Sequence, residues 1–226
     1  MEFGYWAIKA HGEVIRMLAA YLKIPLTEYN PADHSTWAQE KSNFGAPFPN
    51  LPYIVHDGFK LTESRAIIRY MSTISNRSDM MGDGCRSICQ VIQIYGVMSD
   101  IEKSVFSIMR LQTGFEDAYT RVLAEGGSVR GKIAQISEFL GDKDFLVGGL
   151  TIADFEVVYK ARYIQSVAEA LGFDSPFHSH ANLANLIARV EYLPNVKELI
   201  ETRQGCVFSD TGFFPVLLKK QSEFKK

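Results

Sequence analysis

The feature that most constrains the fold of this chain is a change of pattern near residue 75. Before that point, short aromatic and β-branched runs alternate with apolar residues at helical spacing. After it, long helical patterns follow and no run is convincing as a strand. The segment 75–84 is rich in Ser, Asn, Arg, Asp and Gly, which is typical of a linker. We therefore expect an α/β domain at residues 1–76 and an all-helical domain at residues 84–226.

The first domain is expected to alternate strands and helices. The predicted elements are a strand at Phe3–Ile8, a helix at Glu13–Leu22, a strand at Leu26–Tyr29, a weak helical turn at Thr36–Lys41, a hairpin of strands Tyr53–His56 and Phe59–Leu61, and a helix capped by Thr62. This order, a βαβ unit followed by a hairpin and a helix, predicts a mixed sheet with helices packed on it.

The second domain carries a strong helix-start signal at Thr151. Asp154 follows three residues later, which is the spacing of a capping box. The helix that begins there should bury Val157, Val158, Ala161 and Ile164. The other predicted helices lie at residues 86–111, at 115–140 with a weak point at Gly126–Gly127, near Asn182–Val190 and at Asn195–Glu201.

Composition and motifs exclude several classes of function. The net charge is −2 and charged residues make up 22% of the chain, with no basic stretch that predicts a nucleic-acid or membrane partner. Neither a signal-peptide pattern nor a membrane-spanning run is present, and the three cysteines lack CxxC spacing. Cys85 and Cys89, with His178 and His180, suggest a metal site only weakly, and buried packing is expected for the cysteines. We expect a cytoplasmic protein without a metal site or a cofactor.

Several motifs are similar to those of one enzyme family. They are Gly4–Lys9 followed by Val14–Leu18, Phe48–Tyr53 (FPNLPY), Leu61–Tyr70 (LTESRAIIRY) and Thr151–Phe155. In these segments the chain resembles the glutathione transferases, and their mu class in particular. The resemblance implies a thioredoxin-like domain, an all-α helical-bundle domain, glutathione as co-substrate and a homodimer. It also implies a transferase that conjugates the glutathione thiolate to hydrophobic electrophiles in detoxification.

Tyr5 is the expected catalytic residue, because the resemblance places it at the family's catalytic tyrosine. A phenol has a pKa of roughly 10 and therefore remains a hydrogen-bond donor near neutral pH. Donated to the sulfur of glutathione, its hydrogen bond favours thiolate over thiol, and the thiolate is the nucleophile. The alternative is a core tyrosine in an aromatic strand beside Phe3 and Trp6.

The same resemblance implies a set of glutathione-binding residues. They are Trp6, Trp37, Lys41, Asn50, Leu51, Pro52, Glu63, Ser64 and Asp100. The family's proline at Pro52 is cis. Glu63 and Ser64 open a helix, where unpaired backbone N–H groups favour a carboxylate. Trp37 with Lys41 could instead be packing plus a solvated charge, and Asp100 could form a surface ion pair with Lys103.

The expected second-substrate site departs from the family pattern. Its residues would be Ile8, His11, Phe106, Arg110 and Phe208. His11 replaces an apolar residue, Arg110 replaces a tyrosine, His34 stands where an arginine is common, and the loop before Trp37 is shorter than in the mu class. The alternatives are a glutathione-dependent isomerase or peroxidase of sigma type and a non-catalytic ligand-binding relative.

Overall fold

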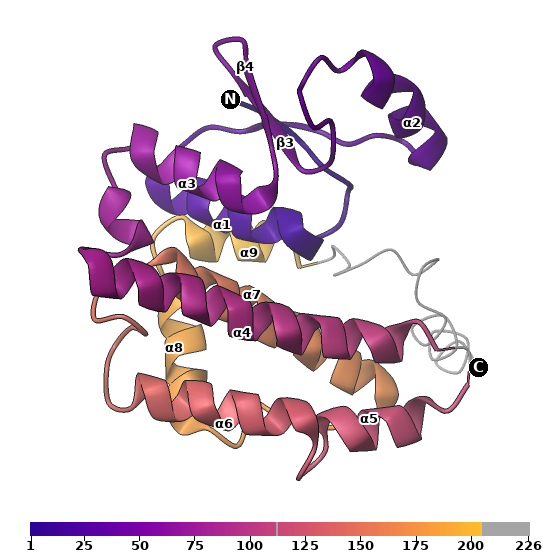
Figure 1. Ribbon diagram of the computed structural model, residues 1–226, viewed down its shortest axis with the longest axis vertical. Coiled ribbons are helices and arrows are strands. Elements are labelled where there is room, and N and C mark those ends of the chain that lie inside the picture. Colours follow the sequence, from indigo (N-terminus) through magenta and orange to yellow (C-terminus); the bar gives the residue numbers. More distant parts are fainter. Residues whose placement is uncertain (112, 205–226) are drawn as a thin grey trace. The chain divides into compact units, whose positions relative to one another are not determined.

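The computed structural model describes residues 1–111 and 113–204, and these fall into two compact units (Figure 1). One unit contains Met1–Met81 together with the segment that begins at Tyr192, and the other contains Gly82–Glu191. Helix α9 (Val196–Thr202) therefore packs on helix α1 (Ala10–Leu22) of the first unit. The sequence pattern had grouped this segment with the helical domain.

The first unit is built on a four-stranded mixed sheet. Its strands are β1 (Glu2–Gly4), β2 (Thr27–Tyr29), β3 (Tyr53–His56) and β4 (Phe59–Thr62). Their order in the sheet is β2-β1-β3-β4, with β1 parallel to β2 and antiparallel to β3. This sheet and the helices around it confirm the predicted thioredoxin-like fold class.

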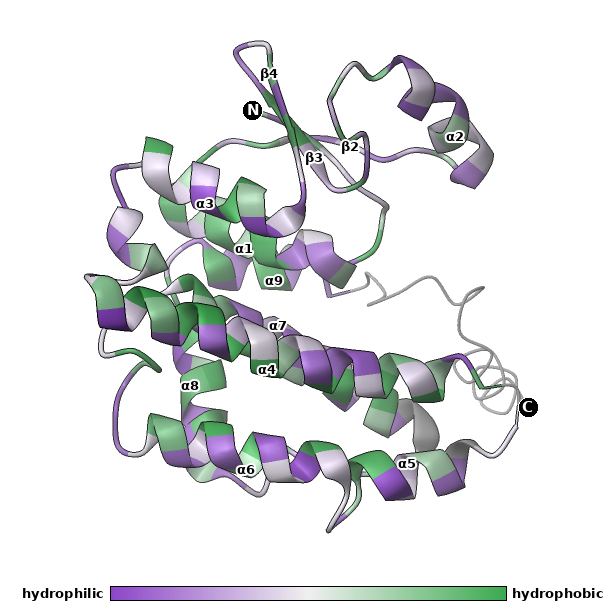
Figure 2. Ribbon diagram, viewed as in Figure 1, coloured by the Kyte–Doolittle hydropathy of each residue, from purple (hydrophilic) through white to green (hydrophobic). Residues whose placement is uncertain are grey.

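The two faces of the sheet are covered by different helices. Helices α1 and α3 (Ser64–Ile74) lie on one side of the strands and α2 (His34–Asn43) on the other (Figure 1). Because side chains alternate along a strand, Phe3 and Ile54 face α1 and α3, and neither is exposed to solvent. The more polar α2 is mainly purple and white in Figure 2.

Gly4 is required by the packing on the α2 face of the sheet. It pairs with Tyr53, whose ring lies across it. A Cβ atom at position 4 would lie 2.0 Å from Cε1 of Tyr53, so any other residue would displace that ring. The absence of a side chain at Gly4 therefore lets the ring of Tyr53 lie against the α2 face of the sheet.

Three boundaries predicted in the first unit were wrong. β1 ends at Gly4 rather than at Ile8, for a reason given below. Helix α2 is a full helix that begins at His34, because the carboxylate of Asp33 accepts a hydrogen bond from the backbone N–H of Thr36 at 2.8 Å. Thr62 is the last residue of β4 and donates to the carbonyl of Phe48, so it does not cap α3.

The second unit is helical throughout its described part. Its helices are α4 (Cys85–Met109), α5 (Phe115–Leu123), α6 (Ser128–Leu140), α7 (Ile152–Leu171) and α8 (Ala181–Glu191). The predicted break at Gly126–Gly127 is confirmed. So is the capping box, in which the carboxylate of Asp154 accepts hydrogen bonds from the backbone N–H and the hydroxyl of Thr151. The four residues predicted to face inward on α7 are all buried.

Two further observations concern residues singled out in the sequence. Cys85 and Cys89 are exposed on the first turns of α4, so the prediction of buried packing was wrong for both. They precede Val91, the first buried residue of α4.

Among the described residues, no cluster of His, Cys, Asp or Glu could hold a metal ion. No helix described by the structure is long and apolar enough to cross a membrane.

Candidate functional site

Tyr5 lies immediately after β1, at the end of the sheet. Its backbone N–H donates to the carbonyl of Tyr29 at 3.0 Å, and Asn30 Nδ2 donates to its carbonyl at 2.8 Å. Its side chain is only 5% exposed and stacks on Phe3 with the ring centroids 6.3 Å apart. Gly12 permits this position, because a Cβ there would lie 2.4 Å from Cδ1 of Tyr5.

The loop that follows Tyr5 is held by Arg16 of α1. This side chain is 1% exposed, and its guanidinium donates to the carbonyls of Ile8 at 2.9 Å and Trp6 at 3.4 Å. Two parallel hydrogen bonds join it to the carboxylate of Glu28 on β2, at 2.9 Å each. These carbonyls are thus satisfied by a side chain rather than by a strand ladder, which explains why β1 is shorter than predicted.

Arg16 belongs to a larger buried network that the sequence analysis missed. Glu13, 5% exposed, lies 3.5 Å from the guanidinium of Arg16 and 3.1 Å from that of Arg203, which follows α9. The two arginines and the two carboxylates, Glu13 and Glu28, balance in charge. The sequence held one signal of this network, because Arg16 stands among apolar residues of the predicted helix. A buried arginine must be paired with an acceptor or a carboxylate.

Three segments converge at one end of the sheet. The register pairs Gly4 with Tyr53 and Tyr53 with Thr62. Because β3 is antiparallel to both neighbours, the residue after Gly4, the residue before Tyr53 and the residue after Thr62 lie at the same end. The register therefore brings together Tyr5, Pro52 and Glu63.

The proline loop is joined to the start of α3. Peptide bond Leu51–Pro52 is cis, as the resemblance implies, and β3 begins at the next residue. The hydroxyl of Thr62 donates to the carbonyl of Phe48 at 2.7 Å, which ties this loop to the end of β4. Asn50, within the loop, is exposed.

Helix α3 begins at Ser64 with Glu63 as its N-cap. Glu63 has a φ of 71°, and no side-chain hydrogen bond caps the helix. Its carbonyl accepts the first helical bond, from Ile67 at 3.0 Å. The first N–H groups of a helix have no acceptor within the helix and carry a partial positive charge. The first turn of α3 contains no acidic residue and includes Arg65, so this end favours an anion.

The side chains expected on α2 do not share one environment. Trp37 is 8% exposed and stacks on Tyr53 at 6.0 Å, so much of its ring is packed between α2 and the sheet. Lys41, one turn later, is exposed. His34 begins the helix and meets the ring of Trp6 edge-on at 4.6 Å.

The expected residues of the second unit lie on α4 or directly after it. Asp100 is exposed and forms an ion pair with Lys132 at 2.7 Å, which lowers the pKa of its carboxyl. Phe106 is half-buried, 5.6 Å from the ring of Tyr163, and Arg110 is exposed at the C-cap. The sequence suggested Lys103 as the partner of Asp100 in a surface ion pair; in the structure that partner is Lys132.

The remaining second-substrate residues belong to the first unit or lie beyond the described chain. Ile8 is half-buried in the loop held by Arg16, and His11 is exposed in the first turn of α1. Phe208 falls outside the described residues.

Comparison with known proteins agrees with this arrangement. Residues 1–73 match the family profile described as "Glutathione S-transferase, N-terminal domain". Glutathione S-transferase 2 of Gallus gallus is 34% identical over 163 residues, which cover 69% of this chain and 71% of that protein. The class-mu 26 kDa isozyme 7 of Fasciola hepatica is 29% identical over 209 residues and covers 90% of this chain and 89% of its own length. The chain belongs to the glutathione S-transferase family.

Similarity to solved structures supports the fold of both units. The glutathione S-transferase Blo t 8 matches with a TM-score of 0.83, at 23% identity, over 95% of this chain and 99% of its own. Rat hPGDS complexed with a quinoline matches with a TM-score of 0.70, at 22% identity, over 89% of this chain and 96% of its own. At these identities the likeness shows the fold alone, so it does not favour the sigma-type alternative.

Proposed function

We propose that this protein is a glutathione transferase that adds the glutathione thiolate to hydrophobic electrophiles. The observation that carries the proposal is the convergence of Tyr5, the cis-proline loop and the start of α3 at one end of the sheet. Such a site can position an extended thiol peptide without a further cofactor. Glutathione supplies the nucleophile, and the protein supplies orientation and a hydrogen bond.

The proposed roles follow from the chemistry of each group. The γ-glutamyl carboxylate of glutathione binds at the N-terminus of α3, to the backbone and hydroxyl of Ser64. The backbone of Leu51 pairs with the cysteinyl part, and Tyr5 donates to its sulfur. Lys41, which is exposed, is the residue that we propose for the glycyl carboxylate. Roles for Trp6, Trp37, Asn50 and Glu63 in binding glutathione stay predictions.

Arg16 acts in this proposal as a positioning residue for Tyr5. It holds the carbonyls of Trp6 and Ile8, so it fixes the loop in which Tyr5 leaves the sheet. We propose no direct contact between Arg16 and glutathione.

Turnover separates this proposal from a non-catalytic ligand-binding relative. The purified protein, mixed with glutathione and a chloronitrobenzene, is expected to form the thioether and release chloride faster than the uncatalysed reaction. A protein that binds glutathione in a calorimeter but forms no thioether with any chloronitrobenzene or other electrophile tested would be a binding protein instead.

Replacing Ser64 by alanine is expected to weaken glutathione binding. A hydrogen bond to a charged group is worth roughly 1.5–3 kcal/mol, so the dissociation constant should rise about ten- to a hundred-fold. Isothermal titration calorimetry measures the change. Ser75→Ala at the other end of α3 is the matched control and should bind like the unaltered protein. Equal affinity of the Ser64 and Ser75 variants would show that the helix start only supports the fold.

A homodimer in the cytoplasm is the state we propose for the protein. Large apolar side chains remain exposed on each unit, including Phe48 at 76% and Ile92 at 59%, and a partner subunit would bury such residues. Asp100 would then serve the neighbouring glutathione site. Light scattering should give about twice the chain mass of 25.4 kDa across micromolar concentrations. A constant single-chain mass would contradict the proposal.

A further inference from the structure

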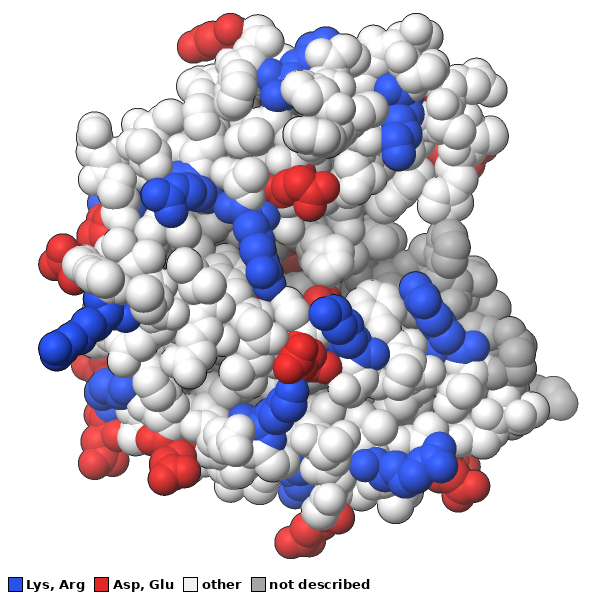
Figure 3. Space-filling view, viewed as in Figure 1, with Lys and Arg blue, Asp and Glu red and all other residues white. Residues whose placement is uncertain are grey.

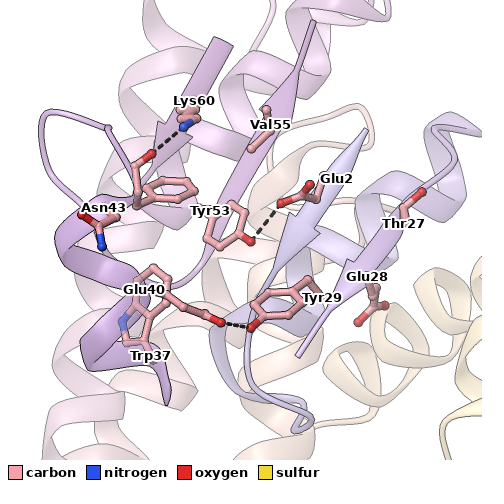
Figure 4. A pocket seen from close by; sticks show the side chains of 11 residues that line it. Glu2, Thr27, Glu28, Tyr29, Trp37, Glu40, Asn43, Tyr53, Val55 and Lys60 are labelled. Atoms are coloured by element: carbon pink, nitrogen blue, oxygen red, sulfur yellow. Dashed lines mark hydrogen bonds between the residues drawn. The ribbon is translucent and has the colours of Figure 1, made fainter. Parts of the chain in front are cut away.

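A cavity lies in the first unit, between α2 and the outer face of the sheet (Figure 4). Its volume is about 660 Å³, within the usual range of about 300–1,000 Å³ for small-molecule sites. Its walls come from β1 to β4 and from α2 with the residue after it. Neither Tyr5 nor Ser64 lines it, so it is separate from the proposed thiol and carboxylate positions.

Aromatic rings form much of the wall of this cavity. Phe44 packs against Tyr53 with the ring centroids 4.4 Å apart, and Trp37 stacks on the same tyrosine at 6.0 Å. Tyr29 lies across the cavity from this group in Figure 4. The faces of such rings attract cations.

One such cation–ring contact already lies at this cavity. Nζ of Lys60 lies 5.0 Å from the ring centroid of Phe44 and donates to the carbonyl of that residue at 2.5 Å. An ammonium group is therefore compatible with the rim of the cavity. Lys60 lies beside Phe44, on the opposite side of the cavity from Glu2 and Tyr29 (Figure 4).

Two carboxylates face the aromatic rings. The phenol of Tyr53 donates to Glu2 at 2.9 Å, and the phenol of Tyr29 donates to Glu40 (Figure 4). Burial and the neighbouring carboxylate raise the pKa of Tyr53, and the hydrogen bond to Glu40 raises the pKa of Tyr29, so both phenols stay protonated donors. An ionised carboxylate can accept about four hydrogen bonds, so each retains acceptor capacity for a ligand.

The charge of the lining favours a cation. Glu28 also lines the cavity, but Arg16 neutralises it through two hydrogen bonds. The remaining charges are Glu2 and Glu40 against Lys60, which leaves one negative charge in excess. An anion would be repelled by two carboxylates here, and a neutral apolar ligand would leave their charge without a counter-ion.

We propose that this cavity binds a small organic cation with primary ammonium groups, which lies against the aromatic rings and donates to Glu2 and Glu40. The site does not depend on glutathione or on the proposed transferase activity, and it shares one residue, Trp37, with the predicted glutathione-binding set. It is built from alternate residues of the strands, since Glu2, Tyr29 and Tyr53 all project from the α2 face of the sheet.

The probe that tests the site is 1,4-diaminobutane, with 1,4-butanediol as its neutral counterpart. Isothermal titration calorimetry on the full chain should detect the diamine and not the diol. Glu2→Gln and Glu40→Gln should each weaken diamine binding about tenfold, since each removes a charge-assisted hydrogen bond. Asp57→Asn, at the exposed hairpin turn, makes the same charge change outside the cavity and should leave binding unaltered.

The position of the bound diamine can be read from the two tryptophans. The indole N–H signal of Trp37, which lines the cavity, should shift in NMR spectra, while that of Trp6 should not. Saturating glutathione should not displace the diamine. The proposal is overturned by equal binding of the diol, by unchanged affinity in both glutamate variants, or by competition between the diamine and glutathione.

Discussion

Replacing Tyr5 by phenylalanine is expected to lower turnover about ten- to a hundred-fold at neutral pH. The ring is only 5% exposed and stacks on Phe3, so the variant keeps its packing and loses only the hydroxyl. A hydrogen bond of roughly 1.5–3 kcal/mol shifts the thiol pKa of bound glutathione by about one to two units. Glutathione should still bind, because the start of α3 and the proline loop are unaltered.

The pH dependence distinguishes thiol activation from a structural effect. The rate of the Tyr5 variant should recover as pH rises, because solvent then removes the proton that the phenol no longer helps to release. Tyr192→Phe is the matched control, since that tyrosine is 70% exposed, and its pH–rate profile should be normal. Neutral-pH turnover of the Tyr5 variant at the unaltered rate would mean that Tyr5 is only a core residue.

Replacing Lys160 by methionine is expected to destabilise the helical unit by about 3–5 kcal/mol. Lys160 on α7 is 2% exposed, and its ammonium lies 2.6 Å from Glu156 and 3.1 Å from Glu102. Methionine fills a similar space but leaves two buried carboxylates without their cation. At roughly 2–4 °C per kcal/mol, the melting temperature should fall by about 6–20 °C.

Thermal denaturation followed by circular dichroism measures this loss. The control is Lys197→Met, which removes an exposed ion pair with Glu201 and should cost at most about 1 kcal/mol. Adding Glu102→Gln and Glu156→Gln to the Lys160 variant should restore part of the stability, because no uncompensated charge remains. Equal melting of the Lys160 and Lys197 variants would show that the buried cluster contributes little.

The order of elements could be predicted from the sequence because it depends on local patterns. Apolar spacing located the helices, and the Asp57–Gly58 turn located the hairpin, which β3 and β4 form. The Thr151 capping box is equally local, and it starts α7 at the expected residue. On the face seen in Figure 3, Lys and Arg side chains are interspersed with Asp and Glu, as the mixed charges of the sequence predict.

Contacts between distant residues account for what the sequence could not predict. β1 ends early because Arg16, from the following helix, takes the carbonyls of Trp6 and Ile8. The position of α9 depends on Arg203, which reaches Glu13 across 190 residues of sequence. The resemblance implies that Trp37 binds glutathione, which stays a prediction; its burial against Tyr53 depends on Gly4, in another strand.

The ionisation of bound glutathione is the most direct test of the central claim that this site activates the thiol. The measurement is the thiolate absorbance of the complex, titrated with pH and compared with free glutathione. We predict a midpoint about one to two units below that of the free thiol, lost in the Tyr5→Phe variant. A complex whose thiol titrates like free glutathione would contradict the claim.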